Sequence, residues 1–240
     1  MAEPVNLSSD STPDYSIDRR FGDFSDHVTV WIDKHIGTEN TYESIKTKFH
    51  DNIQVLQSNN PTENEIDDES MLCADQAMLK KLSDQVYCLK YFSTPEKGLE
   101  YIRTNSKKKI FFISSGTIGK TVVPEIADLP QIQGIYIFCG DISKHTEWAI
   151  DYTTQISAML EHQDDLLERL TRDIALYLET KGDQHKNEQG LLEARNCYAW
   201  AIKLLKRGKM LGDNNTAKSV DRITKKLEEA HSSTICPSEG

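Results

Sequence analysis

The sequence predicts an α/β fold, in which a parallel sheet of about five strands has helices on both faces and a C-terminal all-α segment follows. Three observations predict it. Between residues 27 and 162, short β-branched and aromatic runs alternate with stretches of helical periodicity. Several of these runs are apolar throughout, as in parallel strands that are buried on both faces. From Gln163 onward only helical periodicity remains.

The first part of the chain contains one predicted strand and two predicted helices. Residues 1–26 are rich in Ser, Asp and Pro, and we expect a disordered arm because they offer little apolar surface to bury. Val28–Ile32 is the first predicted strand. A helix is expected near 42–49, where aromatic and aliphatic residues have helical spacing, and another over Met71–Leu82. Residues 57–70 are acidic and turn-rich, which indicates an exposed insertion.

The middle of the chain repeats the order strand, helix, strand, helix. Val86–Phe92 is a strand, and the helix after it starts at Pro95, because proline is favoured at the first helical position. The strand Ile110–Ile113 comes next. A helix is then predicted over Val122–Asp128, where Pro130 stops it.

The last part of the α/β region has the clearest buried strand, Ile135–Cys139. A short helix is predicted over Ser143–Tyr152 and a final strand over Thr154–Leu160. Residues 163–230 are predicted to form a helical hairpin or a three-helix module, and residues 231–240 a tail. The α/β domain therefore spans 27–162.

Charge and hydropathy exclude two classes of partner. The chain has 28 Lys and Arg against 38 Asp and Glu, a net charge of −10. Binding a phosphate backbone needs clustered basic residues, and the run Lys107–Lys109 is interpreted as the solvated edge of a strand. No stretch reaches the roughly 18 apolar residues that a membrane helix requires. We expect a protein that binds neither nucleic acid nor a membrane.

The cysteines indicate the compartment. There are five, widely spaced and without a Cys-x-x-Cys pair. The amino-terminal segment has neither the basic nor the apolar region of a secretory signal. Free thiols without such a signal are typical of a reducing compartment, so we expect the protein to be cytoplasmic.

The segment Lys107–Glu125 holds the strongest candidate for a ligand site. A buried strand that runs into small polar residues ahead of a helix ends at the carboxyl edge of a parallel sheet, where such sheets bind ligands. Backbone amides, a lysine and hydroxyl groups at a helix start suit an anion. We assign no catalytic residue, metal or cofactor. The candidate anion- or ligand-binding residues are Asp33, Ser114, Ser115, Gly116, Thr117, Gly119, Lys120, Thr121 and Asp141.

Within that segment, Ser114–Thr121 resembles a Walker A motif, with a Gly-Lys-Thr ending but Ser114 where the motif has glycine. That resemblance implies nucleotide binding by a loop over 114–121. The same segment is similar to TIR domains, a resemblance that implies NAD cleavage by Glu125, although Val122-Val123 replaces the usual Trp-Cys pair. A nucleotide- or NAD-handling enzyme that uses residues 114–125 is therefore the alternative function.

The strand ends of residues 28–162 resemble the receiver domains of phosphorelay signalling, which have a flavodoxin-like sheet. In that family an acidic pair after the first strand and an aspartate after the third hold Mg²⁺ and accept phosphate. Here Asp33 is followed by Lys34, and the strand Ile110–Ile113 ends in Ser114-Ser115. The resemblance implies a pseudo-receiver without phosphotransfer. The succession WID, FFISSG, VVPEI, IYIFCGD and HTEW is similar to an uncharacterised receiver-like domain of eukaryotic multidomain proteins.

The C-terminal helices resemble a tetratricopeptide unit. The positions that match that repeat's glycine and its small–aromatic–small packing residues are Gly182, Ala194, Tyr198 and Ala201. His185 and Lys206 stand where the repeat has an aromatic residue and a proline. The alternative is a helical hairpin that packs on the α/β domain or on itself. Together the resemblances imply a non-catalytic intracellular interaction or adaptor protein whose protein partner binds the C-terminal helices.

Overall fold

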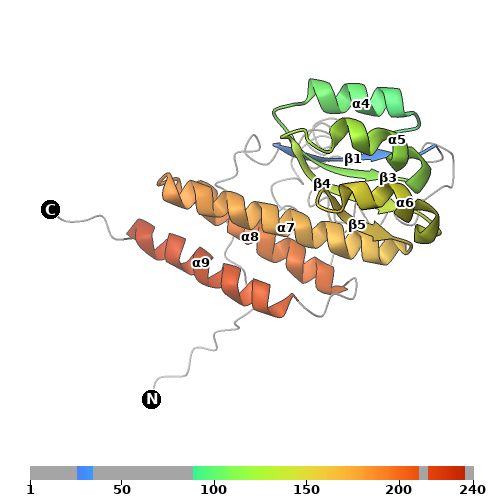
Figure 1. The fold of residues 1–240 in the computed structure, drawn as a ribbon. Helices are drawn as coiled ribbons and strands as arrows, with labels where there is room; N and C mark the ends of the chain where they lie inside the picture. The colour runs from blue at the N-terminus through green and yellow to red at the C-terminus, as the bar shows by residue number, and fades with distance from the viewer. Residues whose placement is uncertain (1–25, 35–88, 211–215, 236–240) are drawn as a thin grey trace, which may run out of the picture.

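The computed structural model describes residues 26–34, 89–210 and 216–235 (Figure 1). Three predictions lie outside these residues: the helix near 42–49, the exposed insertion at 57–70 and the helix Met71–Leu82. The arm before Asp26 and the last five residues of the predicted tail lie outside them as well.

The described strands form one parallel sheet of five strands in the order β2-β1-β3-β4-β5. The strands are β1 (His27–Ile32), β2 (Leu89–Phe92), β3 (Lys109–Ser114), β4 (Ile132–Phe138) and β5 (Ile156–Leu160). This is the strand order of a flavodoxin-like sheet. The predicted fold class is confirmed, and each strand predicted within the described residues is present.

Six α-helices accompany this sheet in the described part of the chain. They are α4 (Pro95–Thr104), α5 (Gly116–Ile126), α6 (Thr146–Ala149), α7 (Gln163–Asn187), α8 (Leu191–Met210) and α9 (Ala217–Ile235). Two short 3₁₀ turns, η3 (Ile142–His145) and η4 (Ile150–Tyr152), flank α6. None of the described helices is long and apolar enough to cross a membrane.

Helices α4 and α5 cover one face of the sheet (Figure 1). Val30 and Phe112 point to this face and are fully buried. They belong to one hydrophobic cluster with Ile102 of α4 and Val123 of α5. Burying each such side chain contributes roughly 1.5–3 kcal/mol, so this cluster holds both helices on the sheet.

Helix α7 covers the opposite face. Trp31 and Phe111 alternate with the residues of the first face along β1 and β3, and they are 1% exposed. Their hydrophobic cluster includes Leu170 and Ile174 of α7 and extends through α8 to Ile223 of α9. The helical segment therefore shares a core with the sheet, and it is a three-helix module: α7 packs on the sheet and on α8, and α8 packs on α9.

Three helix boundaries differ from the sequence prediction. Helix α5 begins at Gly116, ahead of the predicted start at Val122. The single helix expected over Ser143–Tyr152 is divided into η3, α6 and η4, because Asp141 accepts a hydrogen bond from Ser143 N and so starts a tight 3₁₀ turn. Helix α9 continues to Ile235. Its end fits Pro237, because the residue before a proline disfavours the helical conformation.

Candidate functional site

The carboxyl edge of the sheet carries most of the residues that the sequence singles out. Ile32 of β1 pairs with Ser114 of β3, so Asp33 and Ser115 are the next residues of two neighbouring strands. The strand order reverses between β1 and β3, and open α/β sheets bind ligands outside such a switch point. The structure therefore brings Asp33 close to the start of α5.

The predicted loop over 114–121 is wrong in its extent. Ser114 is the last residue of β3, and Ser115 is the residue before α5, with an extended backbone (φ −65°, ψ 157°) and no capping bond from its side chain. Gly116–Thr121 is helical. A Walker A loop must curve around a phosphate, whereas this chain passes from strand to helix through a single residue.

Glycines occupy the start of α5 because other segments of the protein pack closely against its first turns. A Cβ atom on Gly116 would lie 2.2 Å from Cδ2 of His145. A Cβ atom on Gly119 would lie 2.9 Å from Cδ1 of Ile137 and 3.1 Å from Oγ of Ser114. The two glycines therefore permit close packing, and this requirement produces the same sequence pattern as a phosphate loop.

Three polar residues of the Walker-like stretch face solvent. Thr117, Lys120 and Thr121 are exposed, while Gly116 and Gly119 face the protein. The Thr121 hydroxyl donates a hydrogen bond to the carbonyl of Ile118 at 2.9 Å. Lys120 and Ser114 lie on opposite sides of α5, so the structure does not gather them around one ligand position.

Ser114 and Asp33 are buried, at 0% and 3% exposure. The Asp33 amide donates to the carbonyl of Phe92 at 3.0 Å and extends the pairing of β1 with β2. The Ser114 hydroxyl lies under α5 beside Gly119 and has no hydrogen-bond partner among the described residues. Both residues are thus covered by the fold, and neither presents its side chain on the surface.

Asp141, which follows β4, serves as the cap of η3. Its Oδ1 accepts hydrogen bonds from the amide and the hydroxyl of Ser143, at 3.1 and 2.5 Å, and its Oδ2 lies 3.1 Å from Nζ of Lys144. These contacts hold the pKa of Asp141 below its ordinary value. The carboxylate therefore organises the turn that carries His145.

His145 and Trp148 are two residues at this edge that sequence reasoning missed. The His145 ring lies against Gly116 at the first turn of α5, and Trp148 lies against Gly119. The indole Nε1 of Trp148 is 3.5 Å from Nδ1 of His145. Their spacing of three residues places them on one side of a helical turn, a signal that the sequence carries but that does not reveal what they cover.

Glu125, the residue that the TIR resemblance implies, lies on the last turns of α5. It is exposed and forms an ion pair with Arg103 of α4. The pair joins the two helices on the outside of the domain. Glu125 is therefore separated from Ser114 and Ser115, which lie at the start of α5.

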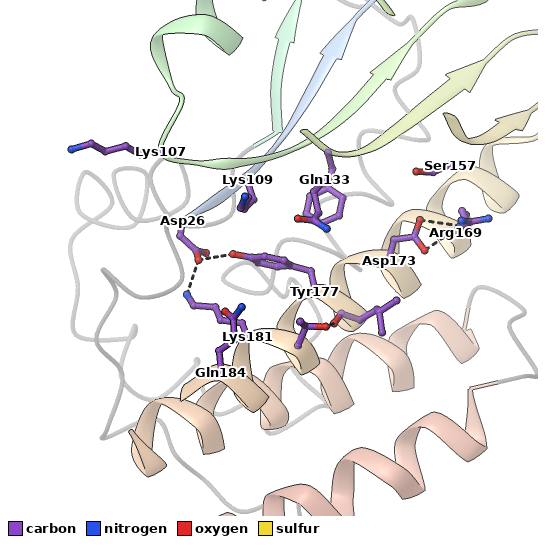
Figure 2. Close-up of a pocket in the computed structure, with 13 residues that line it drawn as sticks. Asp26, Lys107, Lys109, Gln133, Ser157, Arg169, Asp173, Tyr177, Lys181 and Gln184 are labelled. Carbon is purple, nitrogen blue, oxygen red and sulfur yellow. Dashed lines mark hydrogen bonds and ion pairs between the residues drawn. The ribbon is translucent and has the colours of Figure 1, made fainter. Parts of the chain in front are cut away.

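A second candidate site lies at the opposite, amino edge of the sheet. Here a cavity of about 670 Å³, which we call the amino-edge cavity, opens between the sheet and α7 (Figure 2). The sheet side of the cavity is lined by Asp26, Lys107, Lys109, Phe111, Gln133 and Ser157. The α7 side is lined by Arg169, Asp173, Leu176, Tyr177, Thr180, Lys181 and Gln184.

Asp26 anchors one end of this cavity to α7. Its carboxylate accepts a hydrogen bond from the Tyr177 hydroxyl at 2.6 Å and forms an ion pair with Lys181 at 2.7 Å (Figure 2). It also lies 3.2 Å from Nδ1 of His27. Burial opposes the ionisation of Asp26, but these three partners outweigh it and hold its pKa well below the ordinary value. Burial and Asp26 together raise the pKa of Tyr177.

Asp173 has a similar set of partners, but here the carboxylate lies on the helix and the tyrosine on the sheet. It lies on α7 and accepts a hydrogen bond at 2.7 Å from the hydroxyl of Tyr136 on β4. Nε of Arg169 donates to both of its oxygens, at 2.9 and 3.1 Å. Burial and the neighbouring carboxylate raise the pKa of Tyr136. Each acidic residue of the cavity is thus shared between one tyrosine and one cation.

Comparisons with protein-family models, with curated proteins and with solved structures give no match. Within the ranges that the structure describes, no group of three or more His, Cys, Asp or Glu side chains is placed to hold a metal ion.

The close contact at Gly119 leads to a first prediction. Replacing Gly119 with valine is expected to lower the free energy of unfolding by about 1–3 kcal/mol, because the new side chain would overlap Ile137 and Trp148. Replacing the exposed Lys120 with alanine is expected to change it by less than about 0.5 kcal/mol. Urea denaturation followed by circular dichroism measures both. A tolerated valine would mean that α5 does not pack closely at Gly119.

Proposed function

We propose that this chain is a non-catalytic interaction protein of the cytoplasm, in which a pseudo-receiver sheet is the scaffold and the helices α7–α9 bind a protein partner. The observation that carries the proposal is that the residues at the carboxyl edge of the sheet do not face one common position. Ser114 is buried under α5, Asp141 caps η3, and Lys120 faces solvent away from both. These residues support the fold instead of converging on a substrate.

The helical module supports the second half of the proposal. Gly182 of α7 and Tyr198 of α8, two of the positions that resemble a tetratricopeptide unit, are in direct contact. Ile223 and Leu227 of α9 are buried against α8, whereas Lys218 and Lys225 are exposed. Helix α9 thus presents an outer surface of mixed charge, where Asp221 and Glu228 are exposed as well as the two lysines, and we propose this surface as the place where the partner binds.

The compartment and the absence of a nucleic-acid partner are part of the same proposal. Cys139 and Cys197 are free thiols in the structure, which suits a reducing compartment. The net charge of −10 opposes binding to a phosphate backbone.

The partner test uses the full chain with surface substitutions. Deleting 163–230 would uncover the apolar face that contains Trp31 and Phe111, so loss of binding after that deletion would have no clear cause. Instead, we expect that the variant with Lys218→Glu and Lys225→Glu loses the proteins that the immobilised wild-type chain captures from a cell extract. Quantitative mass spectrometry of the captured proteins measures the loss.

A matched control carries the same charge change on the other side of the protein. Lys97→Glu on α4 and Lys120→Glu on α5 also replace two exposed lysines, and this variant is expected to keep the captured proteins. The reverse result would place the partner on α4 and α5. Hydrolysis of ATP or NAD by the purified chain, abolished by Lys120→Ala or Glu125→Gln, would overturn the non-catalytic proposal.

A further inference from the structure

We propose that the amino-edge cavity binds a small organic anion that carries a phosphate group. The cavity has a volume of about 670 Å³, which is within the range of roughly 300–1,000 Å³ that is typical of small-molecule sites. It lies at the opposite edge of the sheet from Ser114–Thr121 and does not involve the outer surface of α9. The proposed site is therefore independent of the partner surface proposed above.

The charge of the lining indicates the class of ligand. Four cationic side chains and two carboxylates line the cavity. The ion pairs Asp26–Lys181 and Asp173–Arg169 neutralise both carboxylates and two of the cations. Two positive charges therefore remain in excess, those of Lys107 and Lys109, in a chain whose net charge is −10. A local reversal of charge in a concave site attracts an anion and raises its local concentration.

Donor groups that are not used by the carboxylates complete the site. Lys109 donates to the carbonyl of Pro130 at 2.9 Å, and an ammonium group has two further donors to offer. Arg169 contacts Asp173 through Nε, and among the described residues its two terminal nitrogens have no hydrogen-bond partner. Figure 2 shows Lys109 and Gln133 on the sheet side of Tyr177, while Lys107 extends outward at the rim.

Two irregularities in the sheet direct polar residues into the same cavity. In the pairing of β3 with β4, Ile110 faces Ile132 and Phe111 faces Gly134, so Gln133 is the extra residue. In the pairing of β4 with β5, Ser157 is skipped in the same way, between partners of Ile135 and Tyr136.

Such bulges are rare between parallel strands, and they turn a side chain toward a position that a regular ladder does not reach. Here two consecutive strand pairs each contain one, and both extra residues, Gln133 and Ser157, line the cavity. This coincidence is independent of the charge count. The two bulges add two polar side chains to the lining, and the Ser157 hydroxyl also accepts a hydrogen bond from the Ile135 amide at 3.3 Å.

The experiment measures binding to the full chain by isothermal titration at low ionic strength. The probes are inorganic phosphate, glycerol 3-phosphate, AMP and, as uncharged counterparts, glycerol and adenosine. We expect a phosphate ester to bind and its uncharged counterpart not to bind. Replacing both Lys107 and Lys109 with alanine is expected to weaken binding about tenfold or more, because charge-assisted hydrogen bonds are lost. Tighter binding of an ester than of inorganic phosphate identifies an organic phosphate as the ligand, whereas equal affinity reduces the site to one for free phosphate and overturns the organic part of the proposal.

The control variant removes the same charge elsewhere. Lys108 is adjacent in sequence but does not line the cavity, and Lys120 lies on α5, so Lys108→Ala combined with Lys120→Ala is expected to retain the wild-type affinity. Equal weakening in both double variants would attribute the effect to net charge and overturn the proposal. If binding is weakened only in the control variant, the anion binds at the start of α5 and the proposal is overturned. The proposal is also overturned if none of the phosphate probes binds. Circular dichroism of each variant confirms that it is folded.

Discussion

Replacing Tyr198 with alanine is expected to lower the free energy of unfolding by about 3–5 kcal/mol, in the range observed for aromatic residues that are removed from a core. Tyr198 lies on α8 and is 0% exposed. Its ring lies directly on the backbone of α7, because a Cβ atom on Gly182 would be only 2.5 Å from Cε1. No neighbouring side chain stands between ring and backbone at Gly182, so the structure has little with which to fill the space that the alanine would leave.

The matched control for this substitution is Tyr198→Phe. It keeps the ring and removes only the hydroxyl, which donates to Oδ1 of Asp183 at 2.8 Å. The expected loss is about 0.5–1.5 kcal/mol. Urea denaturation followed by far-UV circular dichroism measures both variants. If alanine and phenylalanine cost the same, the contact between the ring and Gly182 contributes little, and the packing of α7 on α8 depends on other residues.

The sheet was predictable because its strands are buried on both faces. Ile135–Cys139 is apolar throughout, and Val28–Ile32 is interrupted only by Thr29. Short, mostly apolar runs of this kind are typical of parallel strands covered on both faces. The structure places them in β1 and β4 with shifts of a few residues at the ends. The least apolar of the predicted strands, Thr154–Leu160, forms β5 at the edge of the sheet, where its residues are only partly buried.

The start of α5 was not predictable from local sequence, because a glycine has two physical uses that look the same in one dimension. It permits a tight turn, and it permits two segments to approach each other closely. Gly116 and Gly119 have the second use, since their neighbours are His145, Ile137 and Trp148. These partners lie between 18 and 29 positions further along the chain, so only the folded structure distinguishes the two cases.

The amino-edge cavity was hidden for a related reason. Its lining comes from the beginnings of four strands and from α7. Asp26, the first residue that the structure describes, pairs with Lys181, which follows it by 155 positions. The sequence interpretation of Lys107–Lys109 as a solvated edge treated the three lysines alike. Lys107 and Lys108 lie in the turn before β3, and Lys109 is the first residue of that strand. The structure places Lys107 and Lys109, but not Lys108, in the lining.

A further expected result is that Glu179→Gln destabilises the protein at neutral pH by about 2–3 kcal/mol and makes less difference in acid. Glu179 of α7 is 4% exposed and faces α9. Its carboxylate accepts hydrogen bonds from Nε and Nη2 of Arg222, at 2.9 and 2.7 Å, and pairs with Lys226 at 2.8 Å. Breaking a buried ion pair costs about 3–5 kcal/mol, and we expect less here because Arg222 is half-exposed.

The pH dependence follows from the pKa of Glu179. Burial opposes its ionisation, but the hydrogen bonds from Arg222 and Lys226 hold the pKa below the ordinary value of 4.5. A carboxyl group whose pKa is lower in the folded state stabilises that state above its unfolded pKa. The contribution of Glu179 is therefore complete above pH 4.5 and is lost as the pH falls through the lower, folded value.

Denaturation of wild type and Glu179→Gln at a series of pH values between 7 and 3 tests this account. The two free energies of unfolding are expected to approach each other as the pH falls below 4.5 toward the folded pKa of Glu179, because protonated Glu179 and glutamine are both neutral. Glu228→Gln, an exposed substitution on α9, is the control and is expected to follow the wild type. A difference between wild type and Glu179→Gln that stays constant over the whole range would show that shape and hydrogen bonding hold α9 on α7, and that the charge of Glu179 does not.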